Sequence, residues 1–230
     1  MNSTRARARV AGVLYLLMGV TAAFGVMYIP AAFIVPGDAA ATARRITDAE
    51  FTYRIAILSD FVSQIIFLFL VMSLYNLLRD VNRSYAALMV LLVTVAAAIE
   101  LVNLLNLIAP LILLSGADFL SAFTKPQLDA LALGFLRLRG NGIFIVSAFW
   151  GLWLFPFGIL IIKSGFFPKI LGVLLIVACF AYLTSSFISV VLPAYQHIVS
   201  RVTLPLFAIG ELSIILWLLI RGANAQNHAH

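Results

Sequence analysis

TYRIAILSDFVSQIIFLFLVMSLYNLL, residues 52–78 of the chain, is long and apolar enough to cross a lipid bilayer as a single α-helix. A span needs about 20 mostly apolar residues, since each residue of a helix advances about 1.5 Å. Only Arg54 and Asp60 carry a charge in this stretch. It also lacks the two-residue alternation of a barrel strand, so a helix is the structure that satisfies its backbone groups in hydrocarbon.

Five further stretches repeat this pattern along the chain. The predicted spans are residues 10–35, 52–78, 84–114, 141–162, 168–192 and 202–220. Of the 230 residues, 63% are hydrophobic and 10% are charged, against roughly 45–50% and 25% in soluble domains. We therefore predict an all-α fold, a polytopic six-helix transmembrane bundle, with residues 1–230 forming one integral membrane domain.

An amphipathic stretch separates the third and fourth predicted spans. It opens with Thr124-Lys125-Pro126-Gln127, which has the spacing of a capping box, as does Thr47-Asp48-Ala49-Glu50 before the second span. Four apolar residues then share one helical face, namely Leu128, Leu131, Phe135 and Leu138. This pattern predicts an amphipathic interfacial helix. The alternative is an extended start of the fourth span, interrupted near Gly140.

The basic residues indicate orientation. The net charge of +6 comes from residues scattered at the ends of apolar segments, so we expect the lipid bilayer as partner and no nucleic acid. Eight of the 15 Lys and Arg residues fall on short segments on the side of the N-terminus: Arg5, Arg7, Arg9, Arg79, Arg83, Lys163, Lys169 and Arg221. By the positive-inside rule, the N- and C-termini are predicted to be cytoplasmic. The first span is expected to remain uncleaved.

Three carboxylates lie inside the apolar stretches, and they are the main functional clue. Asp60 shares a helical face with Ser63 and Gln64, which follow it at i+3 and i+4 in the second span. Lipid offers no hydrogen bonds, so such polar residues are expected to face the interior of the bundle.

The other two carboxylates lie in the third and sixth spans. Glu100, Asn103 and Asn106 form a polar stripe on the third span, and Glu211 lies near the middle of the sixth. We therefore expect spans two, three and six to meet around a polar core.

The ionisation state of these acids cannot be assigned from the free-energy costs of insertion and protonation alone. Inserting an ionised acid at a helix centre costs about 2.5–3.5 kcal/mol. Protonating a Glu at pH 7 costs about 3.7 kcal/mol. Because the two costs are nearly equal, neighbouring groups decide the outcome. Candidate neighbours are the amides of the third span, a bound cation, and Arg54 as an ion-pair partner of Asp60.

Three functions fit this constellation. The leading hypothesis is a small-molecule or ion binding protein or transporter, in which a small molecule, a cation or a proton binds at Asp60, Gln64, Glu100, Asn103, Asn106 and Glu211. The first alternative is a non-enzymatic accessory or assembly subunit whose buried acids serve helix packing. The weaker alternative is an intramembrane lipid-modifying enzyme that uses an acid with Asn103 or Asn106.

Missing motifs argue against catalysis. The histidines are His197, His228 and His230, none of them within a predicted span, and Cys179 is the single cysteine. A zinc site or haem ligation within the membrane would require more such ligands. The sequence also has no Gly-x-Ser-x-Gly elbow, His-Glu-x-x-His helix or P-loop. We expect no cofactor, no metal and no catalytic residues.

Several short segments resemble a known family in their order and spacing. They are VAGVLYLL at 10–17, VPGDAA at 35–40, LYNLLRDVNR at 74–83, NLLNL at 103–107, LSGA at 114–117, PQL at 126–128, SGFFPKILG at 164–172, and GELS at 210–213 with Trp217. Together they are similar to the bacterial multi-pass membrane family called domain of unknown function 4386. The resemblance covers nearly the whole chain and implies a protein of the bacterial cytoplasmic (inner) membrane. It transfers no catalytic residue.

Overall fold

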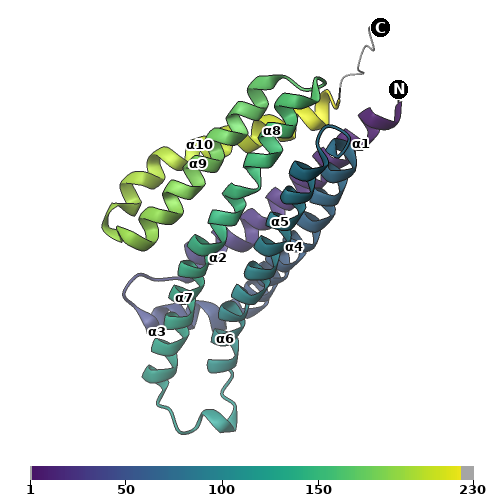
Figure 1. Cartoon of the computed structure of the whole chain (residues 1–230). Helices are drawn as coiled ribbons and strands as arrows, with labels where there is room; N and C mark the ends of the chain where they lie inside the picture. Colours follow the sequence, from purple (N-terminus) through teal and green to yellow (C-terminus); the bar gives the residue numbers. More distant parts are fainter. Residues whose placement is uncertain (1, 224–230) are drawn as a thin grey trace, which may run out of the picture. The chain divides into compact units, whose positions relative to one another are not determined.

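The computed structural model describes residues 2–223 and is all-helical within that range (Figure 1). His228 and His230 lie outside the described residues. The helices are α1 (Asn2–Ala22), α2 (Ile29–Phe33), α3 (Ala39–Asp48), α4 (Glu50–Leu78), α5 (Arg83–Asn103), α6 (Leu105–Leu113), α7 (Lys125–Leu152), α8 (Leu154–Ser164), α9 (Lys169–Val191) and α10 (Gln196–Ile220). A π-helical turn at Ala23–Tyr28 joins α1 to α2.

Six helical segments within the described residues are long and apolar enough to cross a membrane. They are Thr4–Phe33, Glu50–Leu78, Arg83–Leu113, Lys125–Ser164, Lys169–Val191 and Pro193–Ile220. The predicted all-α, six-span fold class is therefore confirmed, and the chain is an integral multi-pass membrane protein.

The amphipathic stretch is the first part of α7, which continues into the fourth span without a break near Gly140. Half of the capping box before it forms, since the Thr124 backbone N–H donates to Gln127 Oε1 at 2.8 Å. The Thr124 hydroxyl donates to the same oxygen at 3.0 Å instead of accepting from the Gln127 N–H. The fourth span is interrupted later, between α7 and α8. Pro156 explains that position, because a proline cannot donate to the carbonyl four residues before it and its ring crowds that carbonyl.

The other predicted capping box does not form. Thr47 Oγ1 donates instead to the Arg44 carbonyl oxygen at 3.0 Å, and α3 continues to Asp48. Glu50, the expected reciprocal partner of Thr47, forms an ion pair with Arg54. The predicted capping box at Thr47 is therefore wrong, because the Thr47 and Glu50 side chains each bond within their own helix.

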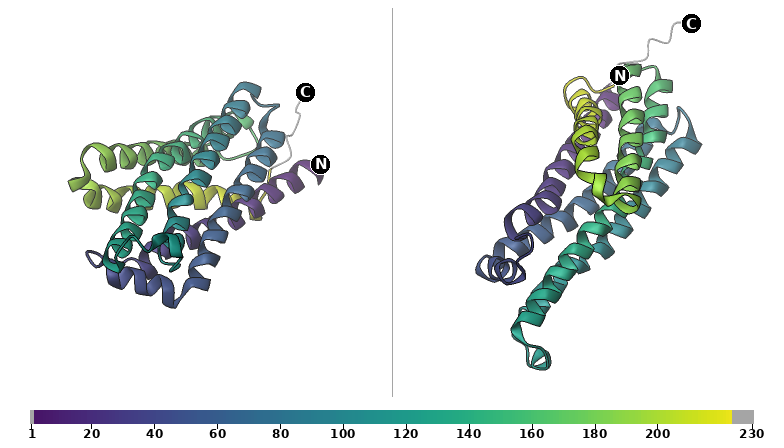
Figure 2. Two further views of the ribbon diagram at one scale, coloured as in Figure 1. Left: turned by 90° about the horizontal axis from the view of Figure 1, so that it is seen from below. Right: turned by 90° about the vertical axis from the view of Figure 1, so that its left-hand side faces the viewer.

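The described helices pack as two compact units. The first contains residues up to Leu17, residues 66–98 and the chain from Phe144 onward, and the second contains residues 18–65 and 99–143. In the first unit, α9 packs between α8 and α10, and α9 and α10 run side by side in Figures 1 and 2. Gly158 and Gly172 allow α8 and α9 to approach closely, since a Cβ on Gly172 would lie 2.5 Å from the Gly158 carbonyl oxygen.

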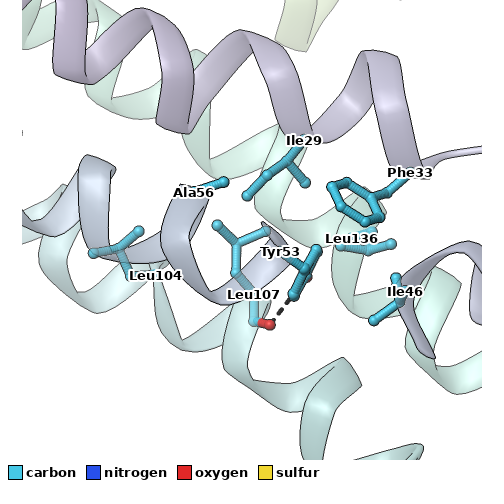
Figure 3. Packing of buried hydrophobic residues seen from close by; sticks show 8 residues of the cluster. All are labelled: Ile29, Phe33, Ile46, Tyr53, Ala56, Leu104, Leu107 and Leu136. Atoms are coloured by element: carbon cyan, nitrogen blue, oxygen red, sulfur yellow. Dashed lines mark hydrogen bonds between the residues drawn. The ribbon is translucent and has the colours of Figure 1, made fainter. Parts of the chain in front are cut away.

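The second unit has an apolar core between α2, α3, α4, α6 and α7. Figure 3 shows its buried members, which are Ile29, Phe33, Ile46, Tyr53, Ala56, Leu104, Leu107 and Leu136. Tyr53 anchors this core because its ring packs edge-on against Phe33 and its hydroxyl donates to the Leu107 carbonyl oxygen at 3.0 Å. This core fixes α4 against α6, and α4 carries the first of the membrane acids.

Candidate functional site

Arg139 of α7 lies between the carboxylates of Asp60 on α4 and Glu100 on α5. Its Nη2 donates to Asp60 Oδ2 and to Glu100 Oε1, each at 2.5 Å. Both acids are fully buried, and only 6% of Arg139 is exposed. We call these three residues, all from the second unit, the arginine cluster.

Polar neighbours on α4 surround the Asp60 side of the cluster. Gln64 Nε2 donates to Asp60 Oδ1 at 3.2 Å and to Ser63 Oγ at 2.8 Å. The Ser63 hydroxyl donates to the Asp60 carbonyl oxygen at 2.7 Å. All three residues are buried. Asp60 Oδ1 therefore accepts a hydrogen bond from its own helix, while Asp60 Oδ2 accepts one from Arg139.

Two asparagines extend the network on the Glu100 side. Asn103 Nδ2 donates to the Arg139 carbonyl oxygen at 3.2 Å and to Glu100 Oε2 at 3.4 Å. Asn106 Nδ2 donates to Asn103 Oδ1 at 3.0 Å. A Cβ on Gly142 would overlap with the Asn103 side chain, so α7 approaches this amide closely where it passes. The amides therefore link α5 and α6 to the backbone of α7.

Gly25, in the first span, packs against Asp60 of the arginine cluster. It is buried in the π-helical turn, and a Cβ at this position would overlap with Asp60. Only glycine permits this contact, because any other residue would push the turn away from α4. π-Helical turns occur frequently at functional sites, and here the turn rests directly on the backbone and Cβ of Asp60, whose carboxylate is part of the arginine cluster.

The cluster has more acids than bases and leaves polar atoms unused. With both carboxylates ionised, one guanidinium leaves a formal charge of −1. Arg139 Nη1 and Gln64 Oε1 are buried and have no hydrogen-bonding partner among the described residues. A buried donor without a partner costs about 1–3 kcal/mol. The arrangement can therefore take up a proton or cation.

Glu211 of α10 belongs to the first unit and has different partners. Its Oε2 accepts a hydrogen bond from the Tyr15 hydroxyl at 2.7 Å, and its Oε1 accepts one from the Tyr182 hydroxyl at 2.8 Å. Tyr182 is held in place by stacking on Phe207, with ring centroids 3.8 Å apart. The structure thus groups Asp60 with Glu100, while Glu211 is grouped with two tyrosines.

Arg54 is not the partner of Asp60. Its Nη2 pairs with Glu50 Oε1 at 2.7 Å, and both side chains are exposed. Helix geometry gives the reason, because Glu50 is one turn away at i−4, whereas a residue six positions on lies about 240° around the helix. The partner of Asp60 is Arg139, which lies 79 residues further along the chain.

A signal for Arg139 was nevertheless present in the sequence. In α7 the buried positions Ala132, Leu136 and Arg139 follow one another at intervals of four and three residues. Arg137, two residues earlier, is exposed. An arginine that continues the apolar face of a helix is expected to be buried and paired with acids.

Comparison with known proteins gives one result. A family model described as "Domain of unknown function (DUF4386)" matches residues 10–222 of the chain. No curated protein and no solved structure matches it.

Proposed function

This multi-pass membrane protein belongs to the DUF4386 family, and we propose that it binds and transports a small molecule or ion through the arginine cluster. The observation that supports this proposal is the surplus acid. Arg139 is buried against two fully buried carboxylates that come from different helices. In our proposal the second carboxylate holds an exchangeable proton or cation.

Helix packing alone does not require this composition. A single acid would neutralise Arg139, and replacing buried ion pairs by apolar residues is often neutral or stabilising. Ionisable residues within membrane helices commonly mark ion pathways and proton relays. A second buried acid in the same cluster is costly for helix packing, but reversible binding of a proton or cation requires it.

We place the protein in the bacterial cytoplasmic membrane with both termini in the cytoplasm. The family resemblance and the basic residues on short connections support this location. The two ends of the described chain also lie together, since Arg5 Nε donates to the Arg221 carbonyl oxygen at 3.3 Å. Six spans place two such ends on one side of a membrane.

The test is the linkage between proton binding and stability. We would measure unfolding of the purified protein in lipid nanodiscs from pH 5.5 to 8.5, with choline as the only cation. If the folded cluster holds a proton that the unfolded chain lacks, stability falls as pH rises, by up to about 1.4 kcal/mol per pH unit. Sodium or potassium that replaced the proton would reduce this slope.

Two variants make the measurement specific. Glu100→Gln removes the surplus acid and should flatten the slope. Glu50→Gln removes an exposed acid that is paired with Arg54 outside the cluster, and it should retain the wild-type slope. Equal slopes in the wild type and Glu100→Gln would overturn the proposal.

A further inference from the structure

Glu211 carries a carboxylate that no basic side chain neutralises. It is partly buried against α1 and α9, and it forms no ion pair within the described part of the chain. Its partners are the hydroxyls of Tyr15, at 2.7 Å, and Tyr182, at 2.8 Å. The acids of the arginine cluster, by contrast, share a guanidinium. Glu211 therefore requires a different source of positive charge.

The position of Glu211 in α10 keeps it away from the charged ends of this span. It precedes Ile220, the last residue of the helix, by nine positions, which at about 1.5 Å each is about 14 Å. The basic residues before and after it on the same segment are Arg201 and Arg221, each ten positions or about 15 Å away. Arg201 is directed to His197 instead, at 3.4 Å.

The group that faces Glu211 from α1 is uncharged. Tyr15 is 1% exposed, and its ring packs against Trp153, with ring centroids 5.7 Å apart. The basic residue of α1 that is closest to it in sequence, Arg9, donates to the Ile220 carbonyl oxygen at the end of α10. The positive charges of α1 are therefore used away from the carboxylate.

The group that faces Glu211 from α9 is uncharged as well. Tyr182 stacks on Phe207 of α10 with ring centroids 3.8 Å apart, so its hydroxyl is held beside the carboxylate one turn further along. The other titratable residue on this part of α9 is Cys179, whose thiol is directed to the backbone of Phe155. Neither helix supplies a cation to Glu211.

A carboxylate in this setting either takes up a proton or holds a cation. An isolated charge is costly in an apolar medium, so a buried acid without a basic partner becomes neutral. Hard metal ions take about six or more oxygen ligands. Both oxygens of Glu211 already have partners, and no cluster of three or more His, Cys, Asp or Glu exists among the described residues. A proton needs only one of these oxygens.

We infer that Glu211, Tyr15 and Tyr182 form a second proton-binding site, which we call the tyrosine site. The ionised carboxylate accepts from both hydroxyls. After protonation its O–H donates to one tyrosine oxygen, and the other tyrosine still donates to the second carboxyl oxygen.

Tyrosine hydroxyls suit this exchange because they can donate or accept, whereas Lys and Arg can only donate. Distances of 2.7 and 2.8 Å fit an O–H···O bond in either direction. The tyrosine site goes beyond the proposed function, since it lies in the first unit and shares no residue with the arginine cluster.

Infrared difference spectroscopy in nanodiscs, with choline as the only cation, detects the C=O stretch of a protonated carboxyl. The wild type should show a band at pH 6 that is missing in Glu211→Gln. The band should be retained in Glu50→Gln, which changes an exposed acid, and in Glu100→Gln, which changes the arginine cluster. Its intensity should fall by about twofold or more between pH 6 and pH 10 and return when the pH is lowered.

The tyrosines provide a second readout. Tyr15→Phe and Tyr182→Phe keep the ring but remove one partner of the carboxyl, so each should shift the band to higher frequency. Tyr195→Phe makes the same change at an exposed position and should leave the band unchanged. Because Glu211 is intact in these variants, they test the site even if Glu211→Gln does not fold.

Three results would overturn the inference. If Glu211→Gln lacked no band, Glu211 would be ionised throughout. If the band did not change with pH, its proton would be a fixed part of helix packing. If sodium in place of choline removed the band at constant pH, the ligand would be a metal cation. Loss of the pH linkage proposed for the arginine cluster would leave the Glu211 band unaffected, so the two proposals fail separately.

Discussion

Replacing Arg139 by Gln removes the guanidinium from between two fully buried carboxylates. In our proposal one carboxyl already holds a proton, so the variant must neutralise the other. Protonating an ordinary Asp or Glu carboxyl at pH 7 costs roughly 4 kcal/mol, at about 1.36 kcal/mol per pH unit. This agrees with the 3–5 kcal/mol typical of a broken buried ion pair. At pH 5 the same cost falls to about 1 kcal/mol.

The variant should therefore be destabilised by about 4 kcal/mol at pH 7 and recover most of this loss at pH 5. The triple variant Arg139→Gln, Asp60→Asn, Glu100→Gln replaces all three charges with amides and should return close to wild-type stability. Arg137→Gln changes an exposed arginine two residues earlier and should cost less than about 0.5 kcal/mol.

Reversible unfolding in mixed micelles, followed by tryptophan fluorescence, measures these differences at both pH values. The reasoning is refuted if Arg139→Gln loses less than about 1 kcal/mol at pH 7. It is refuted equally if the loss does not depend on pH, because the two carboxylates would then not be its source.

Two further predictions concern the contacts of the acids. Gly25→Ala should cost about 1–3 kcal/mol because its Cβ would overlap with Asp60, whereas Gly19→Ala, with no atom within 4 Å of its added Cβ, should be neutral or slightly stabilising; equal effects would contradict the close packing. Tyr182→Phe removes one of the two hydroxyl donors to Glu211 and should cost about 1–3 kcal/mol in the same unfolding assay; an unchanged midpoint would show that this hydrogen bond contributes nothing.

The six spans could be predicted because hydrocarbon imposes a length and a composition on every segment that crosses it. The polar faces of α4 and α5 could be predicted for a similar reason, since residues at i, i+3 and i+4 are neighbours on any helix. Asp60, Ser63 and Gln64 do contact one another. Such local relations depend only on helix geometry.

Contacts between helices could not be predicted in this way. Arg139 binds Asp60, which is 79 residues away, and Tyr15 binds Glu211, which is 196 residues away. The helical periodicity of one segment does not indicate which face of another segment it contacts. Arg137 and Arg139 illustrate the point, because two residues apart on one helix they lie about 200° apart around its axis. One is exposed and the other is buried against two acids.

The π-helical turn connects the arginine cluster to an apolar cavity. Gly25 contacts Asp60, and Gly25 and the next residue, Val26, line this cavity, which has a volume of about 230 Å³. Because the backbone at Gly25 already touches Asp60, a ligand that moved this turn would have to move Asp60 relative to Arg139 or lose the contact. Filling the cavity and changing the charge of the acid are then coupled through one short segment. A transporter requires coupling of this kind between its binding events.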